Sequence, residues 1–478
     1  MQMRKEDKSS NRLLELVKNG QPMTFGQQLK LTVQLSIPAI ISQLSSILMQ
    51  FIDASMVGSL GAEASASIGL VSTTSWLFGG LTLACATGFF VQTAHLLGAK
   101  DNANARSVLR QSISVCLAFS LMLAAAGSAI SGHLPHWLGG EERICTDASS
   151  YFLIFALSLP FLQLNVLASG MLRSSGNMYT PTVLNIMMCI LDVIFNFLLI
   201  FPSLEIQGTG IIVPGAGLGV TGAAIGTALA TVVTALMLMR ALCLKSPDLR
   251  LTQDRGSFRP TSACIRNALG IALPMGCERV VMCGAQIMST IIVAPLGTIA
   301  IAANAFAITA ESICYMPGFG ISNAATTLVG QSVGARRTDL TWRFANISMV
   351  MGIAVMAVMG IVMYAGAPFI MGVMTPVEDV VDLGSRILRI EAFAEPMYAA
   401  SIVAYGIFVG VGDTLVPSIM NLGSIWAVRL TLAAFLAPRY GLQGVWTAMC
   451  IELCFRGMIF LVRLYSRNWL RKIEKKRR

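Results

Sequence analysis

The chain has 478 residues, of which 55% are hydrophobic and only 12% are charged, and its mean hydropathy is +0.70. A soluble globular domain carries about 25% charged residues, so this composition excludes an ordinary water-soluble protein. The net charge of +10 does not indicate a nucleic-acid partner, because the basic residues gather beside apolar segments and in the two terminal segments, as they do near a lipid bilayer.

Long stretches without any charge, such as residues 112–129 and 349–365, predict an all-α polytopic membrane protein. The strands of a membrane β-barrel would instead alternate over about 10 residues. In chain order, the twelve predicted transmembrane helices lie at residues 31–57, 66–96, 108–130, 149–172, 181–202, 219–242, 267–293, 302–332, 345–370, 385–409, 415–437 and 443–465.

These spans predict two lobes, an N-lobe at residues 31–244 and a C-lobe at residues 267–465. A polar linker at 245–266 joins them, and the remaining residues form an N-terminal segment at 1–30 and a basic tail at 466–478.

The loops between the spans predict the orientation in the membrane. The loops after even-numbered spans are basic, with Arg106, Arg110 and Arg255 among their residues, whereas those after odd-numbered spans include Glu142 and Glu378. The positive-inside rule therefore places both termini and the linker in the cytoplasm of a multi-pass protein of the inner membrane.

The two halves of the chain repeat each other at an offset of 236 residues, so that Pro38 pairs with Pro274 and Gly98 with Gly334. Because each repeat holds six spans, an even number, both halves enter the membrane with the same orientation. We therefore expect two six-helix bundles related by a pseudo-two-fold axis along the membrane normal, as in secondary transporters.

Several repeated glycines predict helix ends or helix packing. Gly61 and Gly297 follow the first span of each half and should end it in the left-handed conformation that glycine tolerates. We expect Gly98 and Gly334 to end the second span of each half in the same way. Other small residues, such as Gly226, indicate helix packing rather than transport.

Carboxylates within apolar spans are costly and mark ion or substrate sites. Asp53 lies in the first span, and Asp192 lies in the fifth, with Asn185 and Asn196 spaced to share its helix face. These four residues form a candidate site for a proton or Na⁺. Na⁺ at Asp53 and Asp192 is the only metal ion that the sequence suggests. The alternative is that neighbouring polar groups satisfy the carboxylates purely for packing.

The second half carries its own candidate acidic site. Glu278 lies in span seven, Glu391 and Glu395 lie one turn apart in span ten, and Arg429 in span eleven could neutralise one of them. Glu311 precedes a Pro-Gly pair in span eight and could face a cavity. Two alternatives to a role in ion binding remain open. Glu278 could form an internal ion pair, and the side chain of Glu391 could extend to the membrane interface.

Further residues could line a substrate cavity, namely Met49, Gln50, Met282 and Gln286, at related places in the two repeats. Their alternative role is packing against lipid or core. No enzyme, cofactor or metal centre is expected, because the three histidines form neither a catalytic triad nor a metal-ligand spacing. Glu452 and Arg456 in span twelve are spaced to satisfy each other.

Taken together, these motifs closely resemble those of the multidrug and toxic compound extrusion (MATE) family. The resemblance rests on Asp53 with its following residues to Gly58, on Met316-Pro317-Gly318, and on Gly412-Asp413-Thr414. It implies a twelve-helix, two-lobed exporter of organic, often cationic and amphipathic compounds in exchange for H⁺ or Na⁺. It also implies that Asp53 and Asp192 are coupling residues.

Two other functions compete with export. A flippase of lipid-linked oligosaccharides would share the two-lobed design, but the cavity helices carry few basic residues besides Arg429 for a pyrophosphate. A passive channel would need filter or charged-ring motifs that the sequence lacks. The expected partners are small-molecule substrates and the bilayer, with the protein acting as a monomer.

Overall fold

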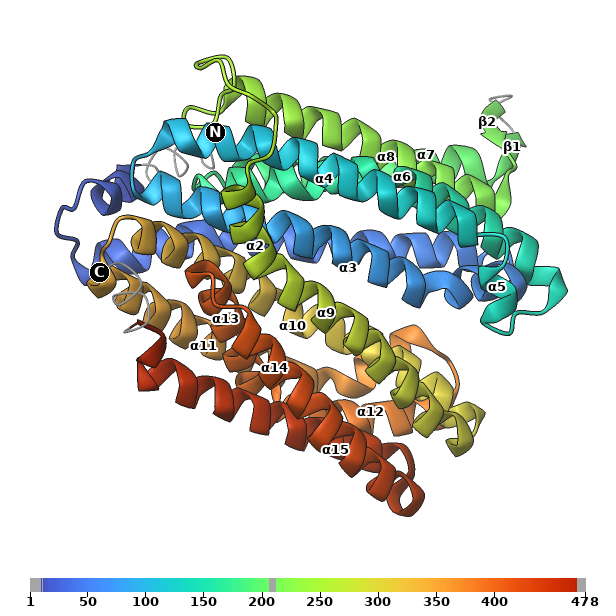
Figure 1. The fold of residues 1–478 in the computed structure, drawn as a ribbon. Coiled ribbons are helices and arrows are strands. Elements are labelled where there is room, and N and C mark those ends of the chain that lie inside the picture. Colours follow the sequence, from blue (N-terminus) through green and yellow to red (C-terminus); the bar gives the residue numbers. More distant parts are fainter. Residues whose placement is uncertain (1–9, 11, 206–211, 471–478) are drawn as a thin grey trace. The chain divides into compact units, whose positions relative to one another are not determined.

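The computed structural model describes residues 10, 12–205 and 212–470, and the chain is nearly all helical (Figure 1). Parts of the predicted N-terminal segment and basic tail therefore lie outside the described residues. Among those described, ten helices are long and apolar enough to cross a membrane, or eleven if one bent pair counts as a single span. The protein is thus a multi-pass helical membrane protein.

The described chain forms two compact units. Unit 2 contains residues 45–93 and 101–272, and unit 1 contains residues 1–44, 94–100 and 273–478. The helices that lie wholly or mainly in unit 2 are α3 (Ala62–Gly98), α4 (Asn102–Ile130), α5 (Leu134–Trp137), α6 (Glu142–Ser174), α7 (Tyr179–Ile200) and α8 (Gly219–Arg240).

Within unit 2, helix α6 packs against α4 and α8, and α7 packs against α8. Phe78 and Phe152 meet edge to face, 5.7 Å apart, in a buried apolar cluster between α3 and α6. A π-helix of residues Ala241–Lys245 continues α8. This framework fixes the positions of the polar side chains on α7.

The loop expected after span five contains an unpredicted β-hairpin. Strands β1 (Pro202–Glu205) and β2 (Ile212–Ala216) pair antiparallel. The all-α prediction therefore needs this small correction.

Unit 1 contains most of α9 (Ser262–Val293) and all of the later helices, and it shares α2 (Phe25–Gly58) with unit 2. The later elements are a 3-10 turn (Ala294–Leu296), α10 (Thr298–Gly334), α11 (Thr338–Met374), α12 (Glu378–Ala392), α13 (Glu395–Val411), α14 (Leu415–Gly423), a π-helix (Ser424–Leu430) and α15 (Thr431–Ser466).

The tenth predicted span, at residues 385–409, is not one straight helix. Helices α12 and α13 meet at an angle of 57° across a two-residue break. Pro396 occupies the first turn of α13, where its missing N–H and fixed φ suit a helix start. The break separates Glu391, near the end of α12, from Glu395, the first residue of α13.

The last two predicted spans, at residues 415–437 and 443–465, form one run of helix with a sharp reversal. Gly441 interrupts it with a non-helical φ of 57° and ψ of −141°. The Ser424 hydroxyl donates a hydrogen bond to Glu452, so the two arms lie side by side. Glycine permits this positive φ without strain.

Gly61 and Gly297 adopt positive φ values of 119° and 95°, which confirms the predicted positive φ, although the ψ of 168° at Gly297 is extended rather than left-handed helical. Gly98 and Gly334 do not behave in this way, and that prediction is wrong. They are the last residues of α3 and α10, and the left-handed conformation falls two residues later, at Lys100 and Arg336.

Gly98 and Gly334 instead permit a close crossing of α3 and α10. A Cβ atom on Gly98 would lie 2.1 Å from the backbone oxygen of Gln331, and one on Gly334 would lie 2.0 Å from that of His95. His95 and Gln331 are also 236 residues apart, so each is the repeat counterpart of the other. The contact of Gly98 with Gln331 is therefore the repeat counterpart of the contact of Gly334 with His95. Glycine is required at these two positions because another backbone lies too close for a side chain, and not because the position needs a positive φ.

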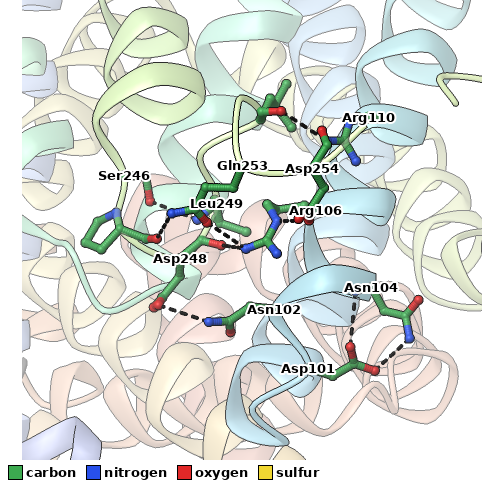
Figure 2. A network of polar contacts seen from close by, with 12 residues as sticks. Asp101, Asn102, Asn104, Arg106, Arg110, Ser246, Asp248, Leu249, Gln253 and Asp254 are labelled. Carbon is green, nitrogen blue, oxygen red and sulfur yellow. Dashed lines mark hydrogen bonds and ion pairs between the residues drawn. The ribbon is translucent and has the colours of Figure 1, made fainter. Parts of the chain in front are cut away.

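The linker after α8 folds back onto the start of α4 (Figure 2). The Arg106 guanidinium donates to the Asp248 backbone oxygen at 3.2 Å and forms an ion pair with Asp254. Arg110 donates to the Leu251 backbone oxygen at 3.1 Å. Both arginines were counted as loop charges, but they lie buried within α4 and anchor the linker.

Candidate functional site

The carboxylates predicted in the first half meet in unit 2. The Asn196 side-chain amide donates to Asp53 Oδ1 at 2.9 Å and to Asp192 Oδ2 at 3.2 Å. Asp192 and Asn196 are one turn apart on α7, and Asp53 comes from α2. The three residues therefore form one cluster, which we call the Asp53 site.

In the Asp53 site, Asp192 and Asn196 are buried and Asp53 is half-buried, and the hydrogen-bonding capacity of the site is incompletely satisfied. Asp192 is 0% exposed, and its Oδ1 atom has no hydrogen-bond partner among the described residues. The Oδ1 atom of Asn196 also lacks a described partner. Two carboxylates that share one amide donor repel each other, and a proton or a monovalent cation between them would remove the repulsion. Carboxylate and amide oxygens are also hard ligands of the kind that suit Na⁺.

Gly226 on α8 makes room for Asn196, a role that sequence reasoning assigned only to general helix packing. A Cβ atom at position 226 would lie 2.1 Å from Asn196 Oδ1 and 3.0 Å from its backbone nitrogen. The amide that bridges the two carboxylates can occupy its position only because residue 226 has no side chain.

Gly226→Ala is therefore expected to displace Asn196 and weaken ion binding at the Asp53 site. Overpacking costs about 1–3 kcal/mol. Where the ion-binding geometry of Asn196 bears this cost, the affinity for the ion falls about 5- to 150-fold. The matched control is Gly69→Ala in α3, where the added methyl group meets nothing within 4 Å. The effect is measured as ion-dependent transport by the two purified variants. Equal transport by Gly226→Ala and Gly69→Ala would contradict the role given to Gly226.

Asn185 does not join the Asp53 site, although it shares α7 with Asp192. Its amide donates to the Ser46 hydroxyl of α2 at 3.0 Å instead. Met49 is half-buried on α2 and Gln50 is exposed. The predicted face of α7 therefore contacts α2 at two places along the helices, at Asn185 and at Asn196. Only the contact at Asn196 includes carboxylates.

Glu278 lies on α9 in unit 1 and is 8% exposed. Its carboxylate accepts hydrogen bonds from Tyr405 at 2.7 Å, Ser418 at 2.6 Å and Asn421 at 2.8 Å. Sequence reasoning missed the first two donors. The repeat offset could have found Asn421, because it pairs Asn421 with Asn185, which likewise reaches the first helix of its own half.

A second group of carboxylates lies around the break between α12 and α13. Glu391 and Glu395 are each 1% exposed, and Glu311 on α10 is 7% exposed. Both carboxylate oxygens of Glu395 and one of Glu391 lack hydrogen-bond partners among the described residues. We call these three residues the Glu395 cluster.

The burial of Glu391 excludes the alternative that this side chain reaches the membrane interface. Neighbouring Arg389 points away, because it lies over the Tyr364 ring at 5.7 Å and donates to the Tyr364 backbone oxygen. Unpaired buried acids of this kind have few structural uses and are typical of ion-binding positions.

Arg429 and Arg456 come from the helical segments that follow the Glu395 cluster in the chain. Arg456 forms the predicted ion pair with Glu452, with Nε 2.9 Å from Oε1 and Nη2 2.9 Å from Oε2. Arg429 contacts Met449 instead. No ion pair within 4.0 Å joins Arg429 to a carboxylate in the described part of the chain.

The other cavity candidates do not gather around these acids. Met282 packs against a small apolar cluster with Ile425 and Leu430, and Gln286 is exposed. Their place in a substrate cavity stays a prediction.

Long apolar helices that bury unpaired carboxylates define a polytopic membrane transporter as the class of this protein. The profile of the MatE family matches residues 38–198 and 274–435, which cover most of both repeats. The chain therefore belongs to the MATE family of transporters.

Relatives match along almost the whole chain. A probable multidrug resistance protein NorM of Thermotoga maritima is 24% identical over 445 residues, covering 91% of this chain and 92% of its own. A protein of the same name from Bacillus cereus is 23% identical over 452 residues, covering 93% and 96%.

Solved structures of low sequence identity share the fold. A MOP superfamily transporter from Pyrococcus furiosus superposes with a TM-score of 0.84 at 19% identity, covering 92% of this chain and 96% of its own. The outward-facing conformation of a multidrug resistance MATE family transporter gives 0.84 at 19% identity, covering 95% and 97%.

Proposed function

We propose that this protein exports organic compounds, chiefly amphipathic cations, by antiport with H⁺ or Na⁺. The observation that carries the proposal is the buried Oδ1 of Asp192, which has no hydrogen-bond partner among the described residues and lies beside Asp53. The names of the NorM relatives support multidrug export as the physiological role. No further cofactor is required, and we propose that the protein works as a monomer.

We infer that the chain crosses the membrane twelve times. The bent pair α12–α13 counts as one span, and the reversal at Gly441 divides the run from Leu415 to Ser466 into two. The reciprocal contacts of Gly98 and Gly334 support a two-fold relation between the repeats. Residues 31–244 and 267–465 would then form the two lobes, joined by a linker at 245–266.

Export would follow from competition between an ion and a substrate. A proton or Na⁺ at the Asp53 site removes the repulsion between two carboxylates that share one amide donor and so favours one conformation of the transporter. An organic cation that favours the other conformation then lowers the affinity for the ion, and the ion lowers the affinity for the substrate by the same factor. The Glu395 cluster and Glu278 form a second site at which an ion and an organic cation could compete in the same way.

The charge of the buried clusters argues against the flippase alternative. The Glu395 cluster and the Asp53 site hold five carboxylates, four of them buried and Asp53 half-buried, whereas Arg456 is already neutralised by Glu452. An acidic interior suits a cation, and a lipid-linked pyrophosphate would need unpaired basic residues there.

The test is efflux of a fluorescent organic cation from sealed vesicles that contain the purified protein, with pH and Na⁺ gradients imposed separately. Export driven by either gradient supports the proposal and identifies the ion. Equal efflux without any gradient would indicate a passive pathway and contradict it.

The proposed orientation predicts a clear labelling pattern. In a background without native cysteines, Glu142→Cys should react with an impermeant thiol reagent added outside the cell, and Arg255→Cys should react only after the membrane is opened. Both native side chains are exposed, so burial does not confuse the comparison. The reverse pattern would place both termini outside and contradict the orientation.

A further inference from the structure

A cavity of about 420 Å³ opens in unit 2 where α6 ends, α7 begins and α8 passes into its π-helix. One part of its lining is apolar, with Leu172, Val183 and Met237. Another part is polar and basic, with Arg240 and Lys245. The cavity is therefore amphipathic, and it lies apart from the Asp53 site described above.

The π-helix brings the two cations together. Residues five apart lie on different faces of an α-helix. In a π-helix, however, the backbone hydrogen bond runs between residues i and i+5, so each turn is wider. Lys245 therefore follows Arg240 on the same side of the helix. Such π turns occur frequently at functional sites.

The linker holds the end of the π-helix in place. Ser246 lines the cavity and accepts a hydrogen bond from the Leu249 backbone N–H at 3.3 Å (Figure 2). Asp248, two residues farther on, accepts a hydrogen bond from Asn102 at 3.3 Å. The contacts between the linker and α4 thus fix the backbone immediately after Lys245.

Neither Arg240 nor Lys245 is neutralised within the described part of the chain, where no carboxylate lies within 4.0 Å of either. Both side chains are exposed at the end of a membrane-spanning helix. Val183 and Met237, 38% and 41% exposed, continue the apolar lining onto the outer surface. Two free cations above an apolar groove complement a ligand with an anionic group and a hydrocarbon chain.

We propose that this cavity binds a phospholipid with an anionic head group. The lipid phosphate would lie against Arg240 and Lys245, and an acyl chain would follow Val183 and Met237 down the groove. The orientation proposed above places this end of the helices at the cytoplasmic leaflet, where anionic lipids are concentrated. The inference concerns a lipid site outside the transport reaction and does not depend on which ion drives export.

The test compares lipids bound to the full purified chain in a neutral detergent. The probes are phosphatidylglycerol, phosphatidylcholine and, as a soluble anion, inorganic phosphate, with binding measured by native mass spectrometry. Phosphatidylglycerol should bind more tightly than phosphatidylcholine. Arg240→Gln with Lys245→Gln should weaken its binding about 25-fold, from about a factor of five for each basic residue.

Two further variants locate the site. Arg250→Gln with Arg255→Gln removes the same charge from exposed linker positions outside the cavity and should leave lipid binding unchanged. Val183→Trp keeps every charge but fills the groove, and it should displace the lipid. Because this side chain lies partly at the surface, the variant should fold.

Three results would overturn the proposal. Equal loss in the linker variant would mean that net charge alone attracts the lipid. Undiminished phosphatidylglycerol binding in Val183→Trp would mean that the lipid lies elsewhere. Competition by millimolar inorganic phosphate that fully removes the lipid preference would mean that the cavity is a site for small anions.

Discussion

Asp53→Asn is expected to abolish ion-driven export while leaving the protein folded and inserted. Asparagine keeps the size of aspartate and can still contact Asn196, but it cannot take up a proton or carry the charge that holds Na⁺. The repulsion with Asp192 also disappears, so stability should not fall. Efflux of a fluorescent cation from vesicles under an imposed gradient should drop to the rate of vesicles without protein.

Asp192→Asn should have a similar effect, and the double variant should be little worse than either single variant, because the two carboxylates act as one unit. Asp147→Asn is the matched control, since this aspartate is exposed near the start of α6 in the same unit. Wild-type export by Asp53→Asn would show that coupling does not use this site, and Glu278 with the Glu395 cluster would become the leading candidate.

Arg456→Ala is expected to lower the free energy of unfolding by about 3–5 kcal/mol, because it leaves a buried carboxylate without its partner. The side chains of Arg456 and Glu452 are 9% and 0% exposed, and their ion pair has two contacts of 2.9 Å. Thermal unfolding in detergent measures the loss. Combining Arg456→Met with Glu452→Leu should recover most of it, because no unpaired charge remains.

Arg386→Ala provides the control for this prediction. Arg386 and Asp382 have the same spacing of four residues, and one of their contacts is 2.7 Å, but their side chains are 59% and 65% exposed. Surface pairs of this kind contribute about 0–1 kcal/mol. A loss as large in Arg386→Ala as in Arg456→Ala would mean that burial does not determine the strength of the Arg456 pair.

The sequence predicted the main course of the helices and the shared helix face of Asp192 and Asn196, because apolar length and helical spacing are local properties of the chain. The meeting of Asp53 with these two residues was implied by the resemblance to the MATE family, because Asp53 lies on a different helix. It could not predict that Asn185 contacts Ser46 instead, since the choice of partner depends on the level at which α7 crosses α2. The break between α12 and α13 was similarly hidden, although Pro396 was a signal for a helix start.

Glycines were the residues that sequence reasoning interpreted least well. A glycine near a helix end predicts a positive φ, which is correct for Gly61 and Gly297, although Gly297 combines it with an extended ψ of 168° rather than a left-handed helical one. At Gly98, Gly334 and Gly226 the reason is the close approach of another segment, which a single sequence does not reveal. Two of these glycines form the crossing of α3 and α10, and the third completes the Asp53 site.

The most direct test of antiport is the ion movement that a substrate causes. Vesicles containing the wild-type protein, and a pH-sensitive or Na⁺-sensitive dye inside, receive a pulse of an organic cation with no ion gradient imposed. Antiport predicts that substrate entry expels H⁺ or Na⁺, that the dye signal saturates with substrate concentration, and that Asp53→Asn gives none. Substrate uptake without any ion movement in the wild-type protein would contradict coupled exchange.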